Sequence, residues 1–515
     1  MIAPIKILDC TLRDGGYYTN WDFKKELVNT YIQSFNDLPA DYLEIGYRSN
    51  PMKGYLGEFF YCPLYLMEGL KTLSTKKLVI ILDEKDVQPQ HAEQLLRPCV
   101  GLIDMVRIAI DPQNFKRALI LAEAIKKLGF EVGFNVMYMS KWPQQKEFLT
   151  QIKEVNGIAD YFYMVDSYGG VYPADVKNIY DIVREQTVVN IGFHGHNNLE
   201  LALINTLTAI ECGAAIVDAT VTGMGRGAGN LKTELLFTAL HANEKIQLNF
   251  NALANVVDSF SQLQLLYEWG TNLPYMVSGA NSLPQKEVMD WVSKRFYSFN
   301  SIIRALHNQK AGVEDNQRFP IFKATEPIKN VLIIGGGPSA IEHLEALQLF
   351  IKSKNDICLI HASARNAFPY STLKLPQYYC LAGNEGQRLS TVFNKFESFN
   401  GTCILPPYPR KMGTFVPDRV IKATVELSAV TYTAIAKDSH TSLAIQTAIE
   451  LGATQIFITG YDGYGESKLG TKEQEMFIEN ELLFGNAKNA GVTILSLTPT
   501  RYKNIIAGSV YSQLN

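Results

Sequence analysis

The chain has 515 residues, of which 47% are hydrophobic and 19% are charged, and its formal net charge is −3. This length exceeds one ordinary core, so we expect at least two domains. The nearly balanced charge gives no electrostatic reason to expect nucleic acid or an anionic membrane as a partner.

The composition also bears on the compartment. No run approaches the roughly eighteen apolar residues of a membrane span, and the first residues lack the apolar stretch and cleavage site of a signal peptide. Seven scattered cysteines, odd in number, fit reduced thiols better than a disulfide framework or a zinc knuckle. We therefore expect a cytoplasmic protein that binds no membrane.

Short apolar runs alternate with helical patterns in the first half of the chain. The runs cover residues 5–9, 42–46, 78–82, 105–110, 131–137, 161–165, 188–193 and 215–220. Segment 114–128 has Phe115, Ala118 and Ala122 at helical spacing, which predicts a connecting helix and hence parallel strands. Eight such units predict an α/β fold, a (β/α)8 TIM barrel with its chemistry at the carboxyl ends of the strands.

Polar side chains support this placement without any motif. The polar residues are Arg13 after the first run, Glu44 in the second, Asp83 at the end of the third, Arg107 in the fourth, Asn135 in the fifth and Asp166 at the end of the sixth. They fall mainly at one end of the predicted barrel.

The rest of the chain predicts a second domain. Residues 250–306 have mostly helical patterns, and residues 308–327 are polar and aperiodic, as in a linker. Further strands are expected at 330–334, 356–361, 401–405, 432–435, 455–458 and 492–497. We assign residues 1–282 to the barrel, 283–327 to a helical extension and linker, and 328–515 to a doubly wound Rossmann-like domain.

His194-Gly-His196 stands at the carboxyl end of the seventh run. Side chains two apart on a strand point the same way, so both imidazoles can face one cation. Loops 12–16 and 223–230 can add the Asp14 carboxylate and the Asn230 amide oxygen. Such a site favours Mn²⁺ or Mg²⁺ and also admits Zn²⁺. Two unrelated rim histidines are the alternative.

Arg13 has two interpretations. It could act in catalysis beside Asp14, or it could be a structural cation that pairs with Glu44 in the barrel mouth. Its adjacency to Asp14 favours the first.

Several ordered motifs together resemble one family. They are Leu-Asp-Cys-Thr-Leu-Arg-Asp-Gly-Gly at 8–16, Glu44 in Leu-Glu-Ile-Gly-Tyr, Val-Asp-Ser-Tyr-Gly-Gly at 165–170, His194-Gly-His196-Asn-Asn-Leu, and loop 223–230. Over about the first 280 residues the chain resembles the aldolase branch of the DRE-TIM metallolyase superfamily. That superfamily includes 4-hydroxy-2-oxovalerate aldolase, hydroxymethylglutaryl-CoA lyase and isopropylmalate synthase.

The resemblance implies pyruvate enolate chemistry on a 2-oxo acid, with an aldehyde as the second reactant. Asp14, His194, His196 and Asn230 match the family's metal-shell positions. The cation would act as a Lewis acid, and Arg13 would hold the developing negative oxygen.

Departures from the family narrow the reaction. Loop 223–230 has no cysteine, unlike hydroxymethylglutaryl-CoA lyase, and lacks the glutamate-arginine pair of the acyl-CoA synthases. Claisen-type acyl transfer from acyl-CoA to a 2-oxo acid is therefore the alternative activity. A non-catalytic binding scaffold is the third.

The group that transfers protons is a second departure. The aldolases have a histidine shortly after Arg-Asp-Gly, where this chain has Gly-Tyr-Tyr-Thr-Asn-Trp at 16–21. Tyr17 or Tyr18 would take that role, or both would pack over the barrel mouth. Tyr275 resembles a position near the aldolase site, with packing as its alternative role.

The second domain carries a glycine motif, Gly-Gly-Gly-Pro-Ser-Ala at 335–340, so backbone groups at Gly335, Gly337 and Ser339 could receive a phosphate. No acidic residue ends the next strand, which argues against an ordinary NAD site. Residues 438–442 and 452–463, with Asp462, loosely resemble hydroxymethylpterin pyrophosphokinase-like and motility-accessory domains. This implies a nucleotide or nucleotide sugar as ligand, and a purely structural or oligomerising domain is the alternative.

The sequence thus predicts a divalent-metal-dependent carbon–carbon lyase, an aldolase, that acts on a 2-oxo acid and an aldehyde. A sugar-derived aldehyde would place it in carbohydrate or nucleotide-sugar metabolism. We also expect a homo-oligomer.

Overall fold

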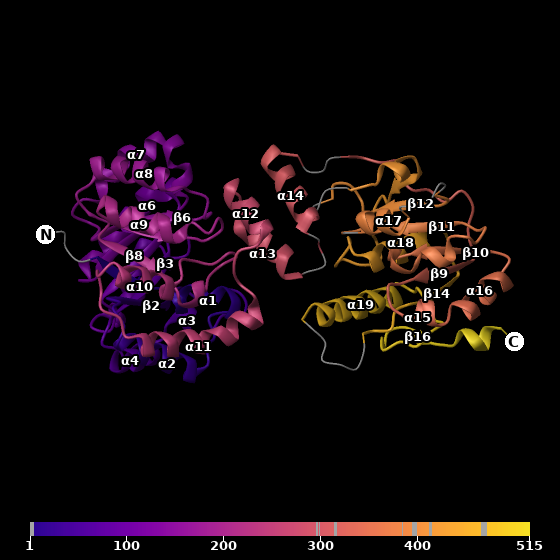
Figure 1. Cartoon of the computed structure of the whole chain (residues 1–515), viewed down its shortest axis with the longest axis horizontal. Helices are drawn as coiled ribbons and strands as arrows, with labels where there is room; N and C mark the ends of the chain where they lie inside the picture. The colour runs from indigo at the N-terminus through magenta and orange to yellow at the C-terminus, as the bar shows by residue number, and fades with distance from the viewer. Residues whose placement is uncertain are drawn as a thin grey trace. The chain divides into compact units, whose positions relative to one another are not determined.

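The structure, a computed structural model, describes residues 5–294, 297, 299–313, 317–383, 385–393, 399–410, 415–464 and 471–514. The chain divides into two compact units, Met1–Met289 and Asp290–Asn515 (Figure 1). Each unit has its own parallel sheet. The assignment of residues 283–327 as extension and linker stays a prediction.

The first unit is the predicted barrel, in which eight parallel strands close in chain order. The strands are β1 (Lys6–Asp9), β2 (Tyr42–Tyr47), β3 (Lys77–Asp83), β4 (Met105–Ile110), β5 (Glu131–Val136), β6 (Tyr161–Asp166), β7 (Asn190–Gly195) and β8 (Ile216–Ala219). Strand β7 begins two residues later than predicted. The reason is that Val188 is 86% exposed and its N–H donates to the Asn156 side chain instead of a ladder.

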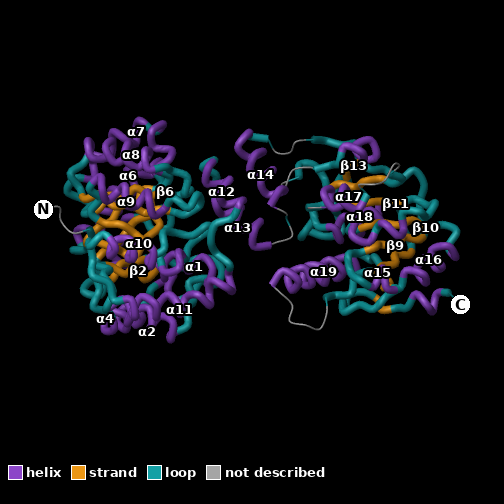
Figure 2. The backbone as a smooth tube through the Cα atoms, viewed as in Figure 1, coloured by secondary structure: helices purple, strands orange, loops and turns teal. Residues whose placement is uncertain are grey.

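Helices surround these strands (Figure 2). They are α1 (Thr11–Thr19), α2 (Lys25–Asn36), α3 (Glu58–Tyr61), α4 (Leu64–Leu73), α5 (Pro89–Leu96), α6 (Phe115–Lys127), α7 (Lys146–Gln151), α8 (Pro173–Gln186), α9 (Ala202–Cys212), α10 (Thr233–Ala242), α11 (Phe250–Tyr267) and α12 (Leu273–Ala280). Helix α13 (Gln285–Lys294) spans the division between the units. The periodicity seen in segment 114–128 is confirmed, since α6 buries Ala118, Leu121 and Ile125.

The barrel interior changes character along its axis. Apolar side chains such as Leu8, Val79, Met105 and Ile216 fill one part of it. Charged side chains, including the fully buried Arg107, lie in the same barrel. A packed interior with polar groups at the carboxyl ends of the strands is what this fold uses to build a site.

The segment after β1 differs from the expected loop, because it is helix α1. Gly16 permits this helix to pack closely: a Cβ there would lie 2.1 Å from the Trp21 indole. The Trp21 Nε1 also donates to the Arg13 carbonyl at 2.9 Å. Arg13 and Asp14 therefore project from an ordered helical turn.

The second unit is an eight-stranded parallel sheet in the order β13-β12-β11-β10-β9-β14-β15-β16. The strands are β9 (Asn330–Ile334), β10 (Ile357–His361), β11 (Gln377–Cys380), β12 (Thr402–Leu405), β13 (Thr424–Glu426), β14 (Gln455–Thr459), β15 (Ile494–Ser496) and β16 (Ile506–Ala507). The helices are α14 (Phe299–Ala311), α15 (Ser339–Glu342), α16 (Leu344–Ser353), α17 (Glu385–Val392), α18 (His440–Glu450) and α19 (Thr471–Asn489).

Both faces of this sheet are covered, which confirms the doubly wound form. Val331 and Ile333 of β9 belong to one apolar core with side chains of α18 and α19. Leu332 and Ile334 point the other way, into a core with side chains of α16. Alternate residues of one strand thus serve two layers.

One predicted strand is wrong. Residues 432–435 are irregular in the structure. The neighbouring Thr431 N–H donates to the Gln446 side chain, and the Ile435 N–H donates to Thr433 Oγ1. These local bonds replace a sheet ladder. Strands β11, β13 and β16 were not predicted.

All seven cysteines are free thiols. Over the residues described, no helix combines the length and apolar character needed to cross a bilayer.

Candidate active site

The predicted barrel residues meet at the carboxyl ends of the strands. Arg13 and Asp14 come from α1, Glu44 from β2, His194 from β7 and Asn230 from the loop after β8. These five side chains are 7% exposed or less. His196, just past β7, is partly exposed and its ring lies 5.0 Å from that of His194. Segments more than 200 residues apart therefore form one cluster.

His194 presents its Nε2 to Asp14, and the Nδ1 atoms of both histidines are hydrogen-bonded. The Nδ1 of His194 donates to Asp218 Oδ2 at 2.8 Å, and the Nδ1 of His196 donates to the Asp166 carbonyl at 2.8 Å. The His194 Nε2 lies 3.9 Å from Asp14 Oδ2. Burial lowers the pKa of His196 to about 3, so its ring is neutral. A neutral imidazole with Nδ1 occupied keeps its Nε2 lone pair for a metal.

The Asn230 amide completes the donor set. Its Nδ2 donates to Asp14 Oδ2 at 2.7 Å, whereas Oδ1 has no hydrogen-bond partner among the described residues. A buried carbonyl oxygen without a partner is costly. A cation bound between Asp14, the two histidines and Asn230 would satisfy it.

The charges in the cluster suit a cation. Arg13 and Arg107 face three buried carboxylates, those of Asp14, Glu44 and Asp218, so one negative charge is in excess. Burial by itself would raise the pKa of Asp14, but Arg13 and the nearby histidines hold it below its usual value. The carboxylate is therefore ionised and available as a ligand.

Arg13 makes the pairing with Glu44 that the sequence offered as its structural role, and its catalytic role stays a prediction. Its Nε donates to Glu44 Oε2 at 2.7 Å, and its Nη1 donates to Asp14. The Nη2 of Arg13 makes no hydrogen bond with any described residue. The structural pairing with Glu44 therefore fixes the guanidinium and leaves one edge for another partner.

A second group of potential ligands lies beside the first. Atoms of Cys10, His194 and Asp218 lie within 4.8 Å of one another. Asp218 Oδ2, however, already accepts from both His194 and Arg107. Burial also raises the pKa of the Cys10 thiol well above its ordinary value. Because a thiol must lose its proton to bind a metal, the set with Asp14 is the better ligand set.

The three predicted tyrosines differ in their surroundings. Tyr17 is partly exposed, and its hydroxyl lies 3.0 Å from that of Tyr47. Tyr18 donates to the Gly227 carbonyl at 3.3 Å, and burial raises its pKa. Tyr275 is 4% exposed and lines Gly227. This geometry favours packing for Tyr18 and Tyr275 and leaves Tyr17 as the candidate for proton transfer.

The glycine motif of the second unit makes internal bonds. The N–H groups of Gly335 and Gly337 donate to the carbonyls of Thr459 and Gly460, each at 2.8 Å. The Ser339 hydroxyl lies 2.9 Å from that of Thr498. A Cβ at residue 337 would lie 1.8 Å from Asp462 Oδ2. The motif thus brings β9 close to the segment after β14, and its phosphate contact stays a prediction.

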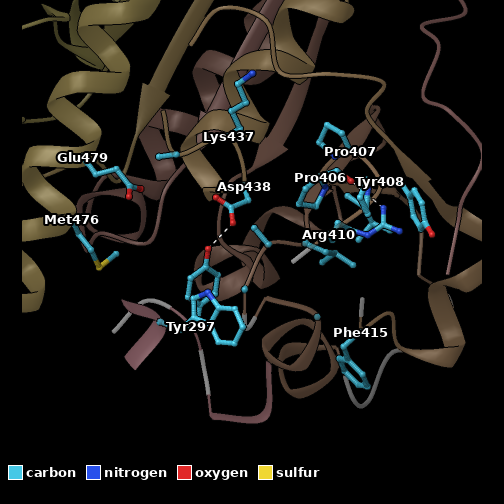
Figure 3. A pocket seen from close by; sticks show the side chains of 18 of the residues that line it. Tyr297, Pro406, Pro407, Tyr408, Arg410, Phe415, Lys437, Asp438, Met476 and Glu479 are labelled. Carbon is cyan, nitrogen blue, oxygen red and sulfur yellow. Dashed lines mark hydrogen bonds between the residues drawn. The ribbon is translucent and has the colours of Figure 1, made fainter. Parts of the chain in front are cut away.

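A cavity of about 820 Å³ lies elsewhere in the second unit (Figure 3). It is lined by segments that follow β11 and β12, by the residues before α18, and by α19. Tyr297, whose hydroxyl donates to Asp438 at 2.5 Å, Tyr408, Arg410 and Phe415 are among its lining residues. Open parallel sheets bind ligands at this end of their strands.

Sequence reasoning noted Arg107 only as a polar residue within the fourth strand, and it missed Asp218 and Arg226 at the barrel site. Asp218 and Arg107 hold His194 and Glu44, and Arg226 lies over the Tyr17 ring at 4.1 Å. Asp218 and Arg107 could have been recognised as buried charges from the sequence, because each is a charged residue inside an apolar run, 215–220 and 105–110. A charge inside a barrel strand requires a buried partner.

Comparisons with known proteins give the family of the barrel. Residues 106–259 match the HMGL-like family. A 4-hydroxy-2-oxovalerate aldolase from Geobacillus genomosp. 3 is 32% identical over 246 residues, which cover 46% of this chain and 70% of the relative. One from Chloroflexus aurantiacus is 31% identical, with 46% and 70% covered.

A solved structure extends the likeness. The N-terminal domain of a "putative aldolase" from Bacteroides vulgatus has a TM-score of 0.56 and 58% identity, covering 58% of this chain and 100% of that one. The chain belongs to the HMGL-like family and, through its barrel, to the carbon–carbon lyases that include the 4-hydroxy-2-oxovalerate aldolases.

Proposed function

We propose that the protein is a divalent-metal-dependent aldolase that cleaves or forms the C3–C4 bond of a 4-hydroxy-2-oxo acid. One observation carries this proposal: His194 Nε2 lies 3.9 Å from the Asp14 carboxylate, which also accepts from the Asn230 amide whose Oδ1 has no partner among the described residues, and the His196 ring lies 5.0 Å from that of His194. The aldolase relatives support the same reaction class.

Asp14, His194, His196 and Asn230 would hold the metal. Two imidazoles and two oxygens suit Mn²⁺ or Mg²⁺, and Zn²⁺ also fits. When bound, the ion supplies a Lewis acid for the oxygens of the 2-oxo acid.

Arg13 would stabilise the charge that develops on the substrate. Glu44 and Asp14 fix its guanidinium, so the free Nη2 edge can donate to the C2 oxygen as negative charge builds there. A preorganised donor needs no rearrangement during the reaction, and this is why such groups accelerate enolate formation.

Tyr17 would transfer the proton. In cleavage, the 4-hydroxyl loses its proton, the C3–C4 bond breaks, and its electron pair forms the enolate of C2 and C3 as the aldehyde leaves. The enolate then takes a proton at C3 to give pyruvate when the substrate has an unsubstituted C3. Tyr17 is the tyrosine at the mouth whose hydroxyl contacts another hydroxyl, that of Tyr47, and not a backbone carbonyl.

The first test uses pyruvate alone. With Mn²⁺, the protein should exchange the methyl protons of pyruvate with deuterium from solvent, as followed by proton NMR. His194→Ala should abolish exchange and weaken Mn²⁺ binding in calorimetry. Unchanged metal affinity would remove this residue from the ligand set. Release of thiol from acetyl-CoA with a 2-oxo acid, without exchange in pyruvate alone, would instead support acyl transfer.

We also propose that the second unit takes a nucleotide or nucleotide sugar in the cavity beyond β11 and β12. The support is its volume of about 820 Å³ and its mixed aromatic and charged lining. Arg410 is already bound to Glu426 at 2.8 Å, whereas aromatic rings such as Tyr408 and Phe415 could stack on a base or sugar.

The intact protein should bind one compound from a panel of nucleotides and nucleotide sugars in calorimetry. Tyr408→Ala should weaken that binding, whereas Tyr511→Ala, at an exposed tyrosine near the carboxyl terminus, should not. No binding to any compound would favour the structural or oligomerising alternative. A homo-oligomer and a cytoplasmic location stay predictions.

A further inference from the structure

Arg226 is a partly exposed cation in the loop that also supplies Asn230. Its guanidinium lies 4.1 Å from the centre of the Tyr17 ring and bonds to Tyr17. Among the described residues, Arg226 takes part in no ion pair with a carboxylate. It is therefore a positive charge at the barrel mouth that no side chain neutralises.

The loop holds Arg226 in a defined place. Gly225 packs on the Asn230 side chain, because a Cβ at 225 would lie 2.6 Å from Asn230 Nδ2. Gly227 has a φ of +64°, and a Cβ there would lie 3.2 Å from Gln285 Oε1. The backbone on both sides of Arg226 is thus packed, against Asn230 of the cluster on one side and against Gln285 on the other.

Electrostatics agree with that position. The pKa of Arg226 is raised chiefly by Tyr17, and Asp14 contributes to the rise. Arg226 in turn contributes to the lowered pKa of His196. The guanidinium is therefore within electrostatic reach of the cluster without being one of its ion pairs.

A half-buried arginine without a counter-ion is costly unless a ligand supplies the charge. The Tyr17 ring compensates only in part, because a cation–π contact is weaker than a charge-assisted hydrogen bond. Arg13 and the metal ligands are placed to receive the 2-oxo acid. Arg226 lies beside Tyr17, the residue that would transfer the proton.

We infer that Arg226 forms an anion subsite for the aldehyde, so that the aldehyde partner carries a carboxylate or a phosphate. This inference rests on the proposed aldolase function. It names the class of the second substrate, and the guanidinium recognises either anion by the same paired N–H donors.

The test compares matched aldehydes in condensation with pyruvate. One pair is butanal and succinic semialdehyde, which differ by a carboxylate. The other is glyceraldehyde and glyceraldehyde 3-phosphate. The protein should prefer an anionic member by about 10- to 100-fold in kcat/KM, the range of one to two charge-assisted hydrogen bonds. A larger preference in the first pair would indicate a carboxylate on the natural aldehyde, and a larger preference in the second pair would indicate a phosphate.

Variants locate the effect. Arg226→Gln should raise KM for the anionic aldehyde by about the same factor and so remove the preference for it over the neutral aldehyde, while KM for pyruvate changes much less. Arg184→Gln is the matched control, since Arg184 also lies over a tyrosine ring, that of Tyr180 at 5.8 Å, but at the end of α8. A preference for neutral aldehydes, or an Arg226→Gln effect on pyruvate instead, would overturn the inference.

Two measurements separate this inference from the proposed function. Deuterium exchange into pyruvate needs no aldehyde, so exchange without anion preference would overturn the subsite alone. Loss of exchange in the unmodified protein would overturn the aldolase. Binding of inorganic phosphate, followed by ³¹P line broadening, tests the subsite in either case: it should disappear in Arg226→Gln, and equal broadening in the variant would contradict us.

Discussion

Asp218 Oδ2 accepts a hydrogen bond from Nδ1 of His194 at 2.8 Å, and it is also the carboxylate that pairs with Arg107. Burial tends to raise the pKa of Asp218, but Arg107 and His194 hold it below its ordinary value. The ionised carboxylate can only accept, so the imidazole proton is fixed on Nδ1. The Nε2 lone pair therefore faces Asp14.

Asp218→Asn should weaken Mn²⁺ binding by about 10- to 100-fold, because the amide no longer fixes the ring as strongly. Calorimetric titration measures the affinity. Glu84→Gln is the control, as Glu84 is a buried acid that pairs with Arg117 and not with the cluster. Equal affinity in the protein and in Asp218→Asn would mean that the His194 tautomer is set by another group.

Arg13→Lys should lower kcat for pyruvate condensation by about 100- to 1,000-fold and change KM much less. A lysine keeps the charge but cannot hold Glu44 and Asp14 while donating a third bond. Steady-state kinetics give both constants, and metal titration checks that Mn²⁺ still binds. A rise in KM with kcat unchanged would assign Arg13 to substrate binding alone.

Tyr17→Phe should lower kcat by about 100- to 10,000-fold if its hydroxyl transfers the proton. Tyr18→Phe should leave kcat nearly unchanged, since that hydroxyl donates to the Gly227 carbonyl. Both variants keep the ring, so packing is preserved. Single-turnover rates measure the chemical step, and equal losses in the two variants would contradict the assignment.

Gly16→Ala should destabilise the barrel by about 1–3 kcal/mol, because its Cβ would lie 2.1 Å from the Trp21 ring. Gly69→Ala, in the exposed part of α4 with nothing within 4 Å of its Cβ, should instead stabilise by about 0.5–1 kcal/mol. Urea unfolding followed by tryptophan fluorescence reports on the barrel, which contains Trp21, Trp142 and Trp269. Equal changes in the free energy of unfolding of the two variants would show that close packing at residue 16 does not control the stability of the barrel.

His361 should make the second unit sensitive to acid. Burial lowers the pKa of its imidazole to about 4, whereas the unfolded chain has the ordinary value of about 6.5. Between these values the unfolded state binds the proton and the folded state does not. The stability is therefore complete above about pH 6.5 and falls as the pH drops towards 4, by up to about 3 kcal/mol.

His361→Phe keeps an aromatic ring against Tyr379 and removes the titration. Hydrogen exchange in peptides from β10 and β11 should lose less protection on acidification in the variant than in the unmodified protein. Comparing both at the same pH cancels the intrinsic exchange rates. Parallel losses would mean that another group controls the acid response.

Much of the site follows from linear patterns. Side chains two residues apart on one strand point the same way, which pairs His194 with His196. The carboxyl ends of parallel strands lie at the same end of a barrel, so Asp14 and Asn230 could be grouped with them from the sequence. Contacts between deeply buried charged groups were harder to predict from the sequence. Asp218 and Arg107 lie inside apolar runs, and their 111-residue separation gives no local signal that they pair.

The second unit shows the same limit. Strands β9, β10, β12, β14 and β15 have apolar runs of sufficient length, and all were predicted. Strands β13 and β16 have three and two residues, too few for a pattern, and exist because a neighbouring strand offers hydrogen bonds. Residues 432–435 had the composition of a strand, but the Ile435 N–H and that of the neighbouring Thr431 donate to side chains instead of a ladder.

The sequence by itself determined the barrel and the second parallel sheet, because strand alternation and helical spacing are properties of neighbouring residues; the metal-donor set that it suggested stays a prediction. Only the tertiary structure decided which histidine nitrogen faces Asp14, that the Tyr18 hydroxyl bonds to a backbone carbonyl, and that Arg226 has no carboxylate partner among the described residues. These outcomes depend on hydrogen bonds and charges between segments far apart in the chain, which spacing along the sequence does not encode.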